Sequence, residues 1–280
     1  MNVAPWSTVA PGTTGPVVTG IQYLLRARAH AVAADGIYGP ATGAAVAAFQ
    51  VSAGLPSDGI VGPDTWPHLV LSTGPGSSGD AVRAVQQFGL LTMPGDEPLE
   101  VDGEYGPITT ERVSFFQESW GLSIDGFAGP ETWSFLSTAL PGPRPWPLVK
   151  QGATQATNWR VLAAQHLLRA KGHDIVADGD FGLQSGGAVI SFQQTLRDTE
   201  IGPVLGQLDW PALIVTISEG DSGDAVRAAQ SLLGGGLAVD GEFGPQTDQA
   251  VRAFQSAFAP PSDGIVGPVT WHALTLRIFD

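Results

Sequence analysis

The nine residues VDGEYGPIT at 101–109 return almost unchanged as VDGEFGPQT at 239–247, and this phrase decides the fold. An Asp can accept a hydrogen bond from the backbone two residues ahead, and a Gly tolerates the positive φ of a sharp turn. The Pro that follows suits the first residue of a helix, because it has no N–H to leave unsatisfied there. The phrase therefore predicts a turn, termed an elbow here, that leads directly into a helix.

Weaker copies of the phrase divide the chain into four units. DGIYGPATGAAVAAFQ (35–50) aligns without gaps with DGEYGPITTERVSFFQ (102–117), DGDFGLQSGGAVISFQ (178–193) and DGEFGPQTDQAVRAFQ (240–255). A helical stretch containing Gln22, Gln86, Gln165 or Gln230 precedes each copy, and a second elbow ending in a Trp follows it. Each unit should thus be helix, elbow, helix, elbow and short helix. We place the units at 1–72, 73–142, 143–216 and 217–280.

The four units form a duplicated pair. The first and third share LLRA(R/K)(A/G)H, whereas the second and fourth share SGDAVRA and VDGE(Y/F)GP. Units of about 65 residues lie near the lower size limit for independent stability, so we expect them to pack on one another. The predicted fold class is all-α: four small three-helix bundles in a compact assembly with pseudo-twofold or pseudo-fourfold symmetry.

Apolar spacing assigns the core. Ala250, Val251 and Phe254 follow Thr247 at spacings of three, four and seven, which places them on one helical face. The Trp at the end of each second elbow is also expected in the core, although its indole N–H could instead face a ligand. We expect the second helix of a unit to begin at Pro40, Pro107 or Pro245, and the third helix to begin at Pro63, Pro130 or Pro268.

Composition excludes several classes of function. A net charge of −14 works against binding to nucleic acid or to anionic lipid. Without cysteine there is no disulfide, no Cys-ligated zinc and no thiol nucleophile. No run reaches the roughly 18 apolar residues of a membrane span, and the start lacks the features of a signal peptide. The expected location is cytoplasmic if this start is native, and the cell envelope or the exterior if a leader was removed.

The combined pattern DG(x)(Y/F)GP(x)T, V(xx)FQ and DG(xx)GP(x)TW(xx)L resembles the type-1 peptidoglycan-binding domain, a three-helix module attached to many cell-wall hydrolases. The resemblance covers nearly the whole chain, four times over, and implies binding to the glycan and stem peptide of the wall. The third unit departs from the pattern. It has Leu183 where Pro is expected, and Gly202-Pro203 where the second Asp-Gly should stand, which places its binding in doubt.

A ligand of this kind calls for aromatic platforms and oriented N–H donors. Each first elbow places backbone amides at a helix N-terminus, beside an aromatic residue. Our hypothesis is that these aromatics and their Asp neighbours line a groove, with two arginines as carboxylate partners. The alternative is that the aromatics are core residues and the arginines are ordinary surface residues. The candidate residues are Asp35, Tyr38, Asp102, Tyr105, Asp178, Phe181, Asp240, Phe243, Arg83 and Arg227.

No catalytic residue, metal site or cofactor is predicted. One carboxylate per elbow does not supply the six to eight oxygens of a calcium site. His166 and His173 are seven residues apart, but the second follows a Gly that should end its helix, so surface or capping roles are expected for both. No zinc-peptidase pattern is present, and no Ser, His and Asp set has motif support.

The leading function is therefore non-catalytic, multivalent binding of cell-wall peptidoglycan by a monomer. The alternative is a protein-interaction scaffold or inhibitor with vestigial wall affinity. The altered third unit and the missing catalytic neighbour favour that alternative, and the acidity would suit a basic protein partner. A designed repeat protein is disfavoured because the copies differ irregularly in length.

Overall fold

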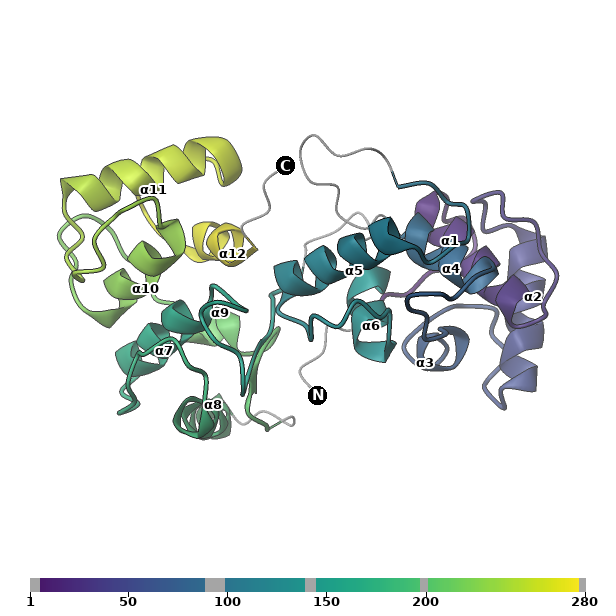
Figure 1. Cartoon of the computed structure of the whole chain (residues 1–280), viewed down its shortest axis with the longest axis horizontal. Helices are drawn as coiled ribbons and strands as arrows, with labels where there is room; N and C mark the ends of the chain where they lie inside the picture. Colours follow the sequence, from purple (N-terminus) through teal and green to yellow (C-terminus); the bar gives the residue numbers. More distant parts are fainter. Residues whose placement is uncertain (1–5, 89–98, 139–144, 197–200, 277–280) are drawn as a thin grey trace. The chain divides into compact units, whose positions relative to one another are not determined.

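The computed structural model describes residues 6–88, 99–138, 145–196 and 201–276 (Figure 1). The chain forms two compact units. One contains most of residues 3–145 and is termed the first pair, because it holds the first two predicted repeats. The other contains most of residues 146–278 and is termed the second pair. The all-α fold class is confirmed, since the described elements are helices apart from one sheet of two short strands.

Helices provide the framework of both pairs. Those of the first pair are α1 Pro16–Ala27, α2 Pro40–Ser52, α3 Trp66–Leu69, α4 Asp80–Gln87, α5 Pro107–Trp120 and α6 Pro130–Ser137. The second pair contains α7 Val161–Ala170, α8 Leu183–Leu196, α9 Trp210–Leu213, α10 Asp224–Leu233, α11 Pro245–Phe258 and α12 Pro268–Leu276, with strands β1 Val149–Lys150 and β2 Val204–Leu205.

An extended segment at the start of each repeat pairs with both of its elbows, a feature that the sequence did not predict. In the first repeat, Val9 pairs with Val61 of the second elbow, and Thr14 pairs with Ile37 of the first elbow. In the third repeat the corresponding pairing is long enough to form the antiparallel strands β1 and β2. Backbone hydrogen bonds therefore tie the irregular parts of each repeat to its own N-terminal segment.

Proline marks most of the helix starts as predicted. The helices α2, α5, α6, α11 and α12 begin at Pro40, Pro107, Pro130, Pro245 and Pro268.

The expected start at Pro63 is wrong, because α3 begins at Trp66. Here the next residue, Pro67, lacks the N–H that would donate to the carbonyl of residue 63. The third repeat also has a proline after its Trp, Pro211, and its short helix α9 likewise begins at Trp210. Ser134 and His272 stand at this position in α6 and α12, and those helices keep their first turn.

Within each pair the two repeats pack through their first helices, as expected for modules of this size. The helices α1 and α4 lie side by side in the first pair, and α7 and α10 do so in the second (Figure 1). In the first pair the ring of Phe88 meets the rings of Trp66 and Trp133 edge-on, with centroids 5.9 and 5.4 Å apart. This aromatic contact makes one continuous core from two repeats.

The elbow tryptophans are core residues, and the alternative that their indole N–H groups face a ligand is wrong. All four are fully buried. Each indole nitrogen donates to a backbone carbonyl in the extended segment that leads into the first helix of its repeat. The four bonds run from Trp66, Trp133, Trp210 and Trp271 to Ser7, Leu71, Pro147 and Val215.

No helix in the described part of the chain combines the length and the apolar character that crossing a membrane requires.

Candidate functional site

Each elbow is built around one buried glutamine from the preceding helix. In the first repeat, Gln22 Nε2 donates to Asp35 Oδ1 at 2.7 Å, to the Ile37 carbonyl at 3.2 Å and to Thr42 Oγ1 at 3.0 Å. Its Oε1 accepts from the Gly36 amide at 2.9 Å. Asp35 Oδ1 also accepts from the Ile37 amide at 2.9 Å, so the predicted bond to the residue two ahead is confirmed. We name this arrangement the glutamine clamp.

Seven elbows in the described part of the chain carry a complete clamp. A Gln precedes each first elbow in the sequence, but no local pattern predicted its role. The FQ glutamine of the following helix performs the same task for the second elbow. The clamping pairs are Gln22 with Asp35, Gln50 with Asp58, Gln86 with Asp102, Gln117 with Asp125, Gln165 with Asp178, Gln230 with Asp240, and Gln255 with Asp263.

The second elbow of the third repeat keeps the clamp by other means. Pro203 has no N–H, so the amide of Gly202 donates to Gln193 Oε1 at 2.8 Å instead. The Gly202 carbonyl replaces the missing carboxylate and accepts from the Val204 amide at 2.8 Å. Asp209 occupies the position of the usual Thr, where its Oδ2 accepts from Gln193 and from the Gly206 amide. The altered sequence therefore retains the turn.

The aromatic part of our predicted groove is wrong. Tyr38 and Tyr105 are buried, and their hydroxyls donate to the carbonyls of Gly59 and Gly126 in the second elbow of the same repeat. Burial of these phenols raises their pKa far above the usual value. A ring that fills the space between two elbows cannot also provide a platform for a sugar. Phe181 and Phe243 are buried at the same position.

The four predicted Asp residues lie at the surface of their elbows. Each has one oxygen held by the clamp and by a backbone amide. The amide two residues ahead is the main cause of a lowered carboxyl pKa, and the Gln side chain is the next. These groups therefore stay ionised to lower pH than an ordinary Asp, as acceptors rather than proton donors. They are Asp35, Asp102, Asp178 and Asp240.

The two predicted arginines lie beside the first elbows of the second and fourth repeats. Arg83 Nη2 donates to the Asp102 carbonyl at 2.9 Å, and Arg227 Nη2 donates to the Asp240 carbonyl at 3.0 Å. Both arginine side chains are about a third exposed, at 35% and 37%. They therefore support the elbow from its outer side and remain open to solvent.

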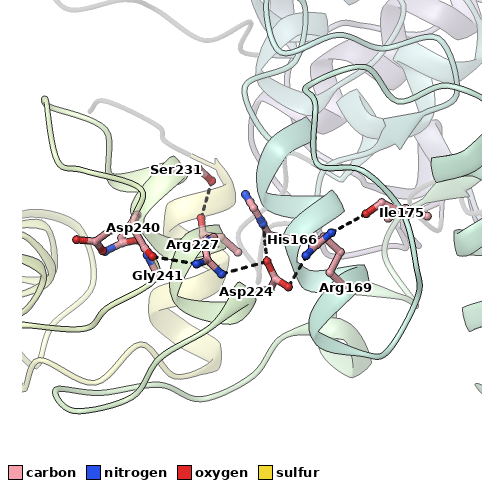
Figure 2. A network of polar contacts seen from close by, with 10 residues as sticks. His166, Arg169, Ile175, Asp224, Arg227, Ser231, Asp240 and Gly241 are labelled. Carbon is pink, nitrogen blue, oxygen red and sulfur yellow. Dashed lines mark hydrogen bonds and ion pairs between the residues drawn. The ribbon is translucent and has the colours of Figure 1, made fainter.

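A polar cluster joins the first helices of the second pair (Figure 2). Asp224, at the start of α10, is its centre. Its Oδ1 lies 3.0 Å from His166 Nδ1 and 3.6 Å from Arg227 Nη1, and its Oδ2 lies 3.1 Å from Arg169 Nε. His166 and Arg169 come from α7, so the cluster links two repeats. Burial lowers the pKa of His166, although Asp224 acts in the opposite direction.

The first pair has the same cluster with one replacement. Asp80 Oδ2 lies 2.9 Å from Arg26 Nε, and Asp80 Oδ1 lies 3.2 Å from Arg83 Nη1. Tyr23 stands where the second pair has His166, and the guanidinium carbon of Arg26 lies 5.6 Å from the centre of its ring. We name these two sets the Arg–Asp–Arg clusters.

Sequence reasoning missed the contacts that cross between repeats. The motif GDAVRA contains the local pair of Asp and Arg three residues apart, but the second arginine comes from the preceding repeat, 55 residues away for Arg169. The surface or capping role expected for His166 is wrong, because it is mostly buried at the junction of α7 and α10. His173 follows Gly172, which has the positive φ of a helix-ending glycine, and its ring meets Phe192 edge-on.

Acidic side chains and histidines do not assemble into a metal site. Among the described residues, no three side chains of His, Asp or Glu lie in a group that could hold a metal ion.

With the elbows and their clamps defined, the chain can be compared with known proteins. The family model described as "Putative peptidoglycan binding domain" matches residues 14–69, 78–136 and 222–274, together more than half of the chain. The chain belongs to this family. The matched segments correspond to the first, second and fourth repeats, and membership of the third repeat stays a prediction.

Relatives share part of the chain. Over 81 residues it is 42% identical to a zinc D-Ala-D-Ala carboxypeptidase of Streptomyces albus G, covering 27% of this chain and 31% of that protein. Over 115 residues it is 37% identical to the N-acetylmuramoyl-L-alanine amidase CwlL of Bacillus licheniformis, covering 39% and 32%. The match thus spans about a third of each relative. A crystal structure of a peptidoglycan-binding protein from Clostridioides difficile is 36% identical over 22% of this chain and 40% of its own, with a TM-score of 0.22.

Proposed function

We propose that this protein is a non-catalytic, multivalent binder of bacterial cell-wall peptidoglycan that works at the cell envelope. The observation that carries the proposal is the threefold match to a peptidoglycan-binding family within one chain. The third repeat supports a fourth, altered module, since its Gln165 clamp is complete and its Gln193 clamp is rebuilt. Several weak sites on one chain can hold a repeating polymer much more tightly than one site can.

The elbow carboxylates support the non-catalytic part of the proposal. Hydrolysis of the glycan normally needs a carboxylic acid whose pKa is raised, so that it can protonate the leaving oxygen. The elbow residues Asp35, Asp58 and Asp102 have lowered pKa values, because backbone amides and clamp glutamines stabilise their charged form. Their hydrogen bonds serve the scaffold, which leaves them unsuited to donate a proton.

Sedimentation with insoluble peptidoglycan tests the binding proposal. Purified protein is mixed with sacculi at low and moderate salt, and muramidase-digested fragments are added as competitor. We expect saturable pelleting that the soluble fragments reverse. Failure of the folded protein to pellet at either salt would overturn the proposal, and capture of a basic protein from the source cell would then test the scaffold alternative.

The non-catalytic part has its own test. The turbidity of a sacculus suspension and the release of soluble fragments are followed during long incubation with the protein. We expect neither to differ from a protein-free control. Steady clearing proportional to protein concentration would show that the chain is an enzyme.

A further inference from the structure

Among the residues that the structure describes, four partly exposed arginines of this acidic protein gather at two places. The chain has 13 basic residues against 27 acidic ones. Arg112 and Arg160 are buried, and Arg28 donates to the backbone carbonyls of Leu69 and Val70. Four of the partly exposed guanidinium groups belong to the two Arg–Asp–Arg clusters. Each cluster has two arginines around its central aspartate, and the charges of Arg83 and Arg227 also help to lower the carboxyl pKa of the neighbouring Asp102 and Asp240.

The shared aspartate fixes the geometry of each cluster. Asp80 contacts Arg26 through one oxygen and Arg83 through the other, so the two guanidinium groups flank a single carboxylate. Asp80 is only 17% exposed, whereas Arg26 is 42% exposed and Arg83 is 35% exposed. The anion therefore lies beneath the two cations, which are the groups that solvent or a ligand meets first.

Hydrogen-bond donors remain on the outer side of the first cluster. Only Nε of Arg26 contacts Asp80, and within the described part of the chain neither of its η nitrogens makes a hydrogen bond. A guanidinium group has five N–H donors in a planar fork that matches the two oxygens of a carboxylate. Tyr23 is half-buried beside Arg26 and adds an aromatic surface next to these donors.

We propose that each Arg–Asp–Arg cluster anchors a carboxylate of the wall's stem peptide. The first cluster is the stronger anchor. This inference rests on the proposed function and deepens it, because the anchor needs an arginine from each of two repeats. The binding unit is then a pair of repeats rather than one repeat, and the chain has two anchors of this kind.

The second cluster is the weaker anchor because its donors are more fully used. Arg169 contacts Asp224 through Nε, and its Nη1 also donates to the Ile175 carbonyl at 2.8 Å. His166 replaces the tyrosine ring and occupies one side of the aspartate. Fewer donors of Arg169 are left for a ligand than of Arg26, so loss of Arg26 should weaken binding more than loss of Arg169.

Single substitutions test the anchor in the full chain. Sacculi freed of phosphate-containing polymers are used throughout, so that peptide carboxylates are their main anions. We expect Arg26→Gln to lower the affinity for sacculi about tenfold, which is the effect of losing a charge-assisted hydrogen bond. Arg169→Gln should lower this affinity less. The matched control is Arg252→Gln, which also removes one partly exposed cation paired with an Asp, but within a single helix. Equal binding by the Arg26 and Arg252 variants would overturn the inference.

Chemical blocking of the ligand gives a second test that needs no variant. Carboxylates of the same sacculi are converted to methylamides, and wild-type protein should then bind to them at least as weakly as Arg26→Gln binds to untreated sacculi, because amidation removes the ligand of both anchors. Undiminished binding to the amidated sacculi would overturn the carboxylate anchor while leaving wall binding intact. Absence of wild-type binding to untreated sacculi would instead contradict the proposed function. Thermal unfolding verifies that each variant is folded, as expected after loss of an exposed ion pair.

Discussion

The two pairs reach the same fold with different residues in the same places, and the differences compensate one another. In the first pair Gly20 of α1 lies against the ring of Phe88, and a Cβ on this glycine would lie 2.1 Å from Phe88 Cε2. The second pair has Ala163 and Leu232 at the two equivalent positions, and both belong to one buried core. A larger residue on one helix thus accompanies a smaller one on the other, which keeps the core filled.

Polar groups in the elbows also compensate for replaced residues. Asp58-Gly59 in the first pair corresponds to Gly202-Pro203 in the second, yet the clamp glutamine is satisfied in both. A backbone carbonyl replaces the lost carboxylate, and an amide one residue earlier replaces the lost amide. Both elbows must pair their buried donors and acceptors, because each one left unpaired would cost free energy. The residues that meet this requirement can change.

The largest predicted effect comes from removing a clamp. Gln50→Leu leaves the Gly59 amide without a partner and removes one hydrogen bond each from Asp58, the Ile60 carbonyl and Thr65 Oγ1, although the last two still bond to each other. At about 1–3 kcal/mol for the unsatisfied amide and about 1 kcal/mol for each further hydrogen bond lost, we expect the free energy of unfolding to fall by about 3 kcal/mol or more. Urea denaturation followed by tryptophan fluorescence measures this change. Gln193→Leu in the rebuilt elbow should have a similar effect if the two clamps are equivalent.

An exposed glutamine provides the control for this prediction. Gln246 lies in the first turn of α11 and faces solvent. Gln246→Leu should change the free energy of unfolding by no more than about 0.5 kcal/mol. If Gln50→Leu were as mild as this control, the clamp would not be the element that holds the elbow.

Sequence could predict the parts of this molecule that depend on neighbours along the chain. The elbow, its Asp-to-backbone bond and the prolines at helix starts follow from residues within about six positions of one another. The expected start at Pro63 is wrong because Pro67, four residues on, lacks the N–H that a helix beginning at Pro63 would use. The repeat pattern also predicted that repeats pack on one another, since it showed modules too small to stand alone.

Contacts between residues that are distant in the sequence could not be predicted from such local patterns. Burial of Tyr38 depends on Gly59, which receives its hydroxyl from 21 residues away. An aromatic residue in a turn is equally compatible with a platform and with a core residue, so the pattern could not decide between them. The Arg–Asp–Arg clusters depend on how α1 meets α4 and α7 meets α10, and no local pattern encodes that meeting.

A second prediction tests whether the core difference between the pairs is compensatory. Gly20→Ala places a methyl group against the buried ring of Phe88, so we expect a loss of about 2 kcal/mol in the free energy of unfolding from overpacking. Adding Phe88→Leu reproduces the combination found in the second pair and should recover much of this loss. A double-mutant cycle in urea measures the coupling between the two positions. Strictly additive effects would show that the two replacements are independent.

The smallest predicted effect distinguishes the polar junctions of the two pairs. His166 faces Asp224 and Arg227 of α10 and lies one turn from Arg169 on α7, and burial lowers its pKa despite the carboxylate. The folded protein therefore binds a proton at His166 less readily than the unfolded chain, whose imidazole has a pKa of about 6.5. The stabilisation from neutral His166 is complete above that pH and is lost as the pH falls through the folded value. The first pair has no histidine at this position.

Urea denaturation at several pH values between about 6.5 and 5 measures how the free energy of unfolding depends on pH. This range lies above the pH at which ordinary carboxyl groups titrate. The free energy of unfolding of the wild type should fall on acidification, by at most about 1.4 kcal/mol per pH unit for a single proton. His166→Tyr makes the second junction like the first and should flatten this dependence, whereas Tyr23→His should steepen it. If the wild type instead became more stable than His166→Tyr on acidification, attraction to Asp224 rather than burial would control the imidazole. The two junctions would then differ in the strength of an ion pair and not in the cost of burying a charge.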